Sequence, residues 1–200
     1  MVISAIIFGW ISVLIFFIIL FTYKKLIDNN EYAFLHILMA VMYSLWLPLP
    51  VTLFYVADSQ VLLIGTIFGI AYISMLIISL SLQTGHIIFL LKQNQDNAIS
   101  EQHGSYMMAT LSNPFEGLLG IFKSIWAFYL ALTFWASEET MFASLITIHS
   151  LFLIYYLFIV LDASLMKRIK LISSVKSNPF VVNLETLLFF LILMVYVTFY

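Results

Sequence analysis

Residues 61–91 have the sequence VLLIGTIFGIAYISMLIISLSLQTGHIIFLL and contain no aspartate, glutamate, lysine or arginine. A helix needs roughly 20 mainly apolar residues to cross the hydrocarbon core of a bilayer. Hydrocarbon offers no hydrogen bonds to an open backbone, so a run of this kind must satisfy its backbone internally, as a helix does. We therefore predict a membrane-spanning helix over residues 60–92.

The composition of the whole chain agrees with this prediction. Of the 200 residues, 64% are hydrophobic and 9% are charged. A water-soluble domain carries about 25% charged residues, because its surface faces water. Lipid is therefore the expected solvent for most of this chain. Its net charge is -2, which gives too few basic residues for a nucleic-acid-binding stripe. The absence of cysteine excludes disulfides and thiolate metal sites.

The hydropathy pattern predicts an all-α integral membrane protein, a single domain over residues 1–200 with six transmembrane helices. The other five predicted helices share an apolar run long enough to span a bilayer and cover residues 2–22, 31–56, 114–135, 139–169 and 179–200. The one long polar segment, residues 93–113, is expected to be a cytoplasmic loop between the third and fourth helices.

The basic residues predict the orientation of these helices. Seven of the eight fall after the first, third and fifth spans: Lys24, Lys25, Lys92, Lys167, Arg168, Lys170 and Lys176. The second and fourth connections carry only acidic charge, at Asp58, Glu138 and Glu139. The positive-inside rule places the basic connections in the cytoplasm, so both ends of the chain are expected outside it. We expect a multi-pass protein of the plasma membrane or a bacterial cytoplasmic membrane.

Two features predict how the helices pack. Pro48 and Pro50 lie in the outer half of the second span and should kink or break it, because proline removes a backbone donor. Gly65 and Gly69 form a GxxxG pattern in the third span, which indicates close approach of a neighbouring helix. The chain is expected to form homo-oligomers or to join other membrane subunits in the lipid bilayer.

Polar residues inside the spans are the candidate functional groups, because ionisable side chains are costly in a membrane. The candidates for a polar cavity are Ser79, Gln83, His86, Glu116, Lys123 and His149. Lys123 has two interpretations: it faces a cavity as an anion or proton site, or it extends toward the headgroups and pairs with Glu116. His149 is interpreted as hydrogen-bonded to another helix, with a proton relay as the alternative.

A second cluster, of His36, Asp162 and Glu185, is expected near the cytoplasmic interface. No metal site or cofactor is expected, because motifs such as H-E-x-x-H are absent from the sequence. One alternative includes a cofactor, a haem for which His36 and His86 would be the axial ligands.

Three functions fit these features. The favoured hypothesis is a non-catalytic accessory, sensor or assembly component of a membrane complex. The alternatives are a small oligomeric transporter of a small molecule or ion, and a haem-binding subunit of an oxidoreductase. Convergence of the cavity candidates on one water-filled space would favour the transporter.

The orientation is testable because the chain has no cysteine of its own. We expect Ser100→Cys, in the long polar loop, to react with an impermeant thiol reagent only from the cytoplasmic side. Ser137→Cys, beside the acidic pair, should react only from the other side. Labelling of both positions from one side would contradict the six-span topology.

Overall fold

The structure is a computed structural model that describes residues 2–93, 102, 104, 106, 113–167, 169, 170, 172, 175 and 178–200. The described residues form helices and turns, without a strand among them. Six helical segments in this part of the chain are long and apolar enough to cross a membrane, as the sequence predicted. Most of the predicted loop 93–113, together with Arg168 and Lys176, lies outside the described residues.

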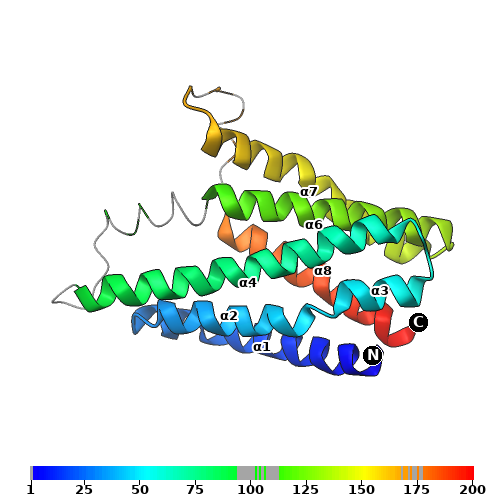
Figure 1. The fold of residues 1–200 in the computed structure, drawn as a ribbon, viewed down its shortest axis with the longest axis horizontal. Coiled ribbons are helices and arrows are strands. Elements are labelled where there is room, and N and C mark those ends of the chain that lie inside the picture. Colours follow the sequence, from blue (N-terminus) through cyan, green and yellow to red (C-terminus); the bar gives the residue numbers. More distant parts are fainter. Residues whose placement is uncertain are drawn as a thin grey trace.

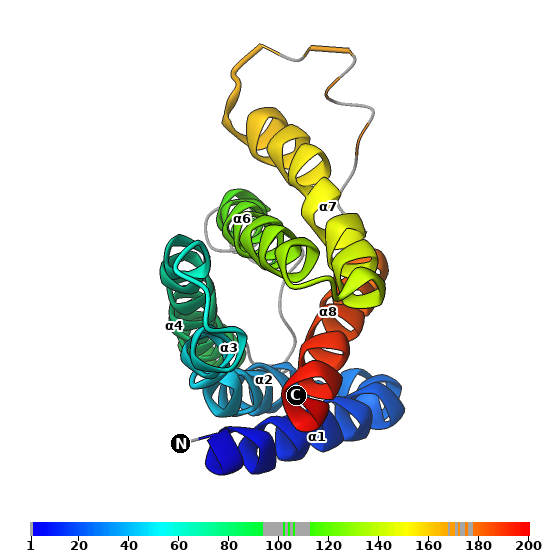
Figure 2. The ribbon, with the colours of Figure 1, turned by 90° about the vertical axis from the view of Figure 1, so that its right-hand side faces the viewer.

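Seven helices make up the six segments, because one segment is broken. They are α1 (Val2–Asp28), α2 (Tyr32–Trp46), α3 (Leu49–Ala57), α4 (Leu62–Gln93), α6 (Asn113–Ala136), α7 (Thr140–Ser164) and α8 (Pro179–Phe199). Their long axes run roughly side by side, and both ends of the chain lie at the same end of the bundle (Figure 1). Viewed along the bundle, each segment packs on the next in the order α1, α2, α4, α6, α7, α8, and α8 returns to α1 (Figure 2).

The two ends of this bundle differ in charge. One end, called the basic end below, carries Lys24, Lys25 and Lys92 at the ends of α1 and α4. The other, called the acidic end, carries Asp58 and the Glu138–Glu139 pair in the turns after α3 and α6. The hydroxyl of Tyr200 donates a hydrogen bond to Glu139 Oε2 at 2.8 Å, and the pKa of Tyr200 is raised mainly by this bond.

Two helix boundaries differ from the prediction by five residues or more. α1 continues to Asp28 instead of residue 22, because two lysines do not break a helix; it stops before Asn29 and Asn30. Asn30 has a φ of 59°, the left-handed conformation that commonly follows a helix end. α7 ends at Ser164 instead of residue 169, because the backbone of Leu165 is extended.

The start of α8 is capped by a side chain, as is usual at a helix N-terminus. Asn178 Oδ1 accepts hydrogen bonds from the amides of Phe180 and Val181 at 3.0 and 3.3 Å.

The predicted break at Pro48 and Pro50 is present. α2 ends at Trp46, Pro48 is the N-cap of α3, and Pro50 lies in the first turn of α3. The freed carbonyl of Ser44 accepts from the Leu47 amide at 3.3 Å. The hydroxyl of Ser12 donates to the Met42 carbonyl at 2.7 Å, which ties α1 to α2 just before the break. Neighbouring groups therefore satisfy part of the backbone around the break.

The GxxxG pattern packs α4 against α6. A Cβ on Gly65 would lie 2.6 Å from Tyr129 Cβ, and a Cβ on Gly69 would lie 2.7 Å from the ring of Trp126. Trp126 is fully buried, and its ring packs edge-on against Phe189 at 5.2 Å between centroids. The ring therefore has little room to move away from Gly69.

We expect Gly69→Ala to lower the free energy of unfolding by about 1–3 kcal/mol, the usual effect of overpacking a core. Gly85 is the matched control, because it lies on the same helix and a Cβ there would meet nothing within 4 Å. Gly85→Ala should leave stability unchanged or slightly raise it. The effects of both substitutions can be measured by unfolding the purified protein in mixed micelles that contain increasing amounts of dodecyl sulfate. Equal effects of the two substitutions would contradict the packing described here.

Candidate functional site

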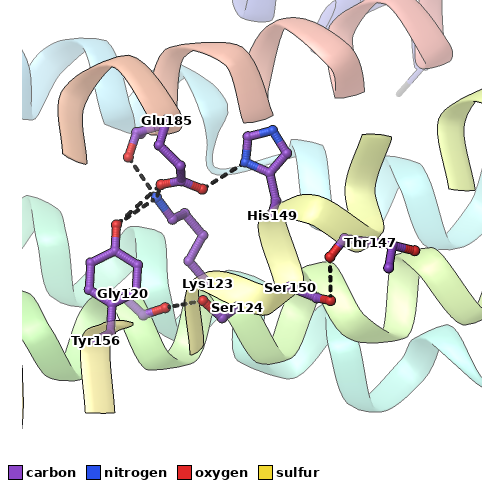
Figure 3. Close-up of polar contacts among 9 residues, drawn as sticks. Gly120, Lys123, Ser124, Thr147, His149, Ser150, Tyr156 and Glu185 are labelled. Carbon is purple, nitrogen blue, oxygen red and sulfur yellow. Dashed lines mark hydrogen bonds and ion pairs between the residues drawn. The ribbon is translucent and has the colours of Figure 1, made fainter. Parts of the chain in front are cut away.

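A buried carboxylate, Glu185 on α8, is held by side chains from two other helices. Its Oε2 forms an ion pair with Lys123 Nζ of α6 and accepts a hydrogen bond from the Tyr156 hydroxyl of α7 at 3.1 Å. Its Oε1 lies 2.7 Å from His149 Nδ1, also of α7. The four side chains converge on one point between the three helices (Figure 3). All four are buried. Because the carboxylate accepts, His149 Nδ1 carries a hydrogen.

The ammonium group of Lys123 has further partners. It donates to Thr186 Oγ1 at 2.7 Å and lies 3.4 Å from the Tyr156 hydroxyl oxygen. The rings of Tyr72 and Tyr156 flank it, with centroids 5.9 and 5.5 Å from Nζ. Aromatic faces attract a cation at such distances. The charge is thus compensated inside the bundle.

Local sequence explains why these groups meet. His149 and Tyr156 are seven residues apart on α7, about two turns, so they share a face. Gly120 lies one turn before Lys123 on α6, and a Cβ at this position would clash with the ring of Tyr156. A glycine here lets Tyr156 pack directly on the α6 backbone and reach Glu185.

The network, consisting of Lys123, His149, Tyr156, Glu185 and Thr186, borders a cavity of about 400 Å³. Tyr23, Tyr32 and Glu116 line the cavity near the basic end, and Glu116 is exposed there. The polar side chains at its deep end are Tyr43, Tyr72, Lys123, Tyr156 and Thr186. Glu185 and His149 are not among the lining residues. Lys123 therefore separates the cavity from the carboxylate behind it.

Aromatic side chains fill the bundle beyond the deep end of the cavity. Trp46 and Phe190 stack with their centroids 3.9 Å apart and their planes 2° from parallel. The ring centroids of Tyr43 and Tyr72 lie 6.1 and 6.4 Å from the ring centroid of Phe190. This aromatic layer, defined as Trp46, Trp126, Phe189 and Phe190, lies on the side of the network toward the acidic end.

The structure brings some of the predicted cavity residues together. Gln83, Glu116 and Lys123 line the cavity. Ser79 is buried behind Gln83 and accepts a hydrogen bond from its Nε2 at 3.2 Å. His149 does not line the cavity, and its hydrogen-bond partner within the network is Glu185. His86 lies on the same helix as Gln83 but outside the lining, and its Nε2 has no hydrogen-bond partner among the described residues.

Two predicted placements need correction. The ion-pair partner of Lys123 is Glu185 instead of Glu116, and the lysine is 2% exposed instead of extending to the headgroups. The predicted interface cluster of His36, Asp162 and Glu185 does not form one group: His36 lines the cavity, Asp162 is exposed, and Glu185 is buried. No feature of the sequence marks Tyr43, Tyr72 or Thr186, whose side chains are common in apolar helices and carry no motif.

The described residues offer no group of three or more histidine, aspartate and glutamate side chains that could hold a metal ion. His36 Nδ1 lies 2.7 Å from the carbonyl oxygen of Tyr32, one turn earlier on α2. The haem hypothesis for His36 and His86 therefore remains a sequence-based prediction.

Comparisons with models of protein families, with curated proteins and with solved structures found no match to this chain. The functional argument therefore rests on the geometry of the network and the cavity.

The ion pair generates a double-substitution test. We expect Lys123→Met or Glu185→Gln alone to lower the free energy of unfolding by about 3–5 kcal/mol, because each leaves a buried charge without its partner. The double variant should be less destabilised than the sum of the two, by about 1–3 kcal/mol. Asp162→Asn, a change to an exposed carboxylate on α7, is the control and should have an effect below about 0.5 kcal/mol. Additive effects at Lys123 and Glu185 would show that the two side chains are not paired.

Proposed function

We propose that this chain is a multi-pass membrane protein whose six helical segments span the bilayer, with the basic end in the cytoplasm. The length and hydropathy of the segments support insertion. The charge difference between the two ends of the bundle supports the orientation. Both ends of the chain would then lie outside the cytoplasm.

We further propose that the protein is a non-catalytic, ligand-binding membrane component, a sensor or accessory subunit. The observation that carries this proposal is the 400 Å³ cavity that ends on the buried ammonium group of Lys123. The cavity falls within the usual size range of small-molecule sites, about 300–1,000 Å³, and combines an apolar lining with a few polar groups. Its mouth would face the cytoplasm.

The energetics of the ion pair support a role beyond stability. Well-packed apolar side chains commonly replace a buried ion pair at no loss of stability. A lysine and a glutamate buried in an apolar bundle therefore suggest a functional use for the charge. Lys123 is also placed between the cavity and Glu185, so a ligand in the cavity would meet the cation directly.

A small transporter is the second candidate, favoured by the position of the helix break. Trp46 ends α2 two residues before Pro48 and stacks on Phe190 in the aromatic layer. The indole nitrogens of Trp46 and Trp126 make no hydrogen bond to any described residue. An unsatisfied buried donor costs about 1–3 kcal/mol, so opening the layer to water would recover part of the cost of separating the rings.

Access of water to the cavity tests the proposal. Leu76→Cys on α4 and Met39→Cys on α2 line the cavity and should react with a small charged thiol reagent from the basic side of oriented vesicles. Ile73→Cys is the matched control, because it is fully buried on α4 and outside the lining. A ligand that fills the cavity should slow labelling at the two lining positions.

Failure of both lining positions to react, while a surface cysteine does react, would mean a dry bundle and would overturn the ligand-binding proposal.

The transporter candidate makes one additional prediction. Leu53→Cys, buried in α3 on the acidic side of the break, should then become reactive from that side in a fraction of the molecules.

A further inference from the structure

A second hollow adjoins the cavity on the side of α1 and α8. It is an apolar groove of about 190 Å³, lined by Phe16, Ile19, Leu20, Tyr23, Leu35, Met39, Met42, Phe180 and Asn183. Four of these residues, Tyr23, Leu35, Met39 and Asn183, also line the cavity. The groove and the cavity are therefore neighbours, with these four residues in the wall of each.

The groove lies in the halves of α1 and α8 that are toward the basic end. At the acidic end the same two helices meet closely, because Gly9 faces Met194 and Trp10 Nε1 donates to Thr198 Oγ1 at 3.0 Å. Two of the groove residues, Leu20 and Phe180, are 51% and 70% exposed. The groove thus opens sideways, to what would be the lipid phase in the proposed membrane position.

The two hollows differ in chemistry. The groove offers aliphatic and aromatic side chains, with the amide of Asn183 and the hydroxyl of Tyr23 where it joins the cavity. The deep end of the cavity offers the ammonium group of Lys123 and the hydroxyls of Tyr43, Tyr72, Tyr156 and Thr186. The ammonium group and the hydroxyls of Tyr43, Tyr72 and Thr186 can donate hydrogen bonds, whereas the Tyr156 hydroxyl donates to Glu185. Such an end suits an anion, which would accept from Lys123 in place of the hydroxyls of Thr186 and Tyr156.

We propose that the ligand of the cavity is a single-chain amphiphile with an anionic head, such as a long-chain fatty acid. The anionic head binds at Lys123, and the hydrocarbon chain of the ligand runs through the cavity into the groove between α1 and α8. This inference rests on the proposed ligand-binding function and adds the class of the ligand and its lateral route from the lipid.

Binding of labelled palmitate to the protein in nanodiscs of zwitterionic lipid tests the head and the chain separately. Hexadecanol has the same chain without the charge, and butyrate has the charge without the long chain. We expect palmitate to bind about tenfold more tightly than hexadecanol, the ratio that corresponds to about 1.4 kcal/mol. Butyrate at the same concentration should not displace it.

Two variants locate the site. In the double variant Lys123→Met/Glu185→Gln, palmitate should lose its advantage, so that it binds no more tightly than hexadecanol. Retained hexadecanol binding shows that this variant is folded. Leu20→Trp, which places a large ring in the groove, should weaken both ligands at least fivefold. Leu14→Trp is its control, because Leu14 is an exposed residue of α1 outside the groove.

Several results would overturn the inference. Equal binding of palmitate and hexadecanol to the unaltered protein would exclude recognition of the charge. Displacement of palmitate by butyrate at equal concentration would indicate a soluble anion instead of an amphiphile. Equal effects of Leu14→Trp and Leu20→Trp on ligand binding would place the hydrocarbon chain of the ligand outside the groove. If the cysteines at positions 76 and 39 react but palmitate does not bind, the ligand-binding function stands and only this ligand class fails.

Discussion

The ion pair between Lys123 and Glu185 is the interaction on which the interior of this bundle depends. It joins α6 to α8, and the same carboxylate holds α7 through His149 and Tyr156. Apolar contacts between helices are weakly specific when the surrounding solvent is also apolar. A carboxylate with three partners from two helices fixes the rotation and depth of each helix at the point where they meet. The aromatic layer then packs on one side of the network, and the cavity remains on the other.

The proposed function rests on the same asymmetry. The carboxylate lies behind Lys123, whereas the cation and the surrounding hydroxyls line the cavity. The network borders the cavity and presents the ammonium group of Lys123 to it. The break at Pro48, two residues after the tryptophan that stacks on Phe190, places an interruption of the helix beside the aromatic layer.

Local features of the fold were predictable from sequence, and long-range pairing was not. Apolar run length located the helical segments, proline chemistry located the break, and small residues located a close helix contact on α4, whose partner only the structure identifies as α6. The seven-residue spacing placed His149 and Tyr156 on one face. One of the two interpretations paired Lys123 with Glu116, and it was wrong because Glu116, about two turns earlier on the same helix, is only the nearest candidate along the chain. Glu185 is 62 residues distant from Lys123, and only the closure of the helix ring brings it near. Tyr43 and Tyr72 were missed because a tyrosine in an apolar helix gives no sign of whether it faces a cavity or a neighbour.

Solid-state NMR of the protein in phospholipid bilayers tests the central claim most directly. The measurement is the dipolar coupling of ¹⁵N-labelled Lys123 Nζ to ¹³C-labelled glutamate side-chain carboxyls and to lipid phosphorus, with Glu185→Gln used to assign the carboxyl signal. The account predicts a strong coupling to the carboxyl carbon of Glu185 and none to phosphorus. Coupling to lipid phosphorus without coupling to Glu185 would place the ammonium group at the headgroups and contradict the buried pair.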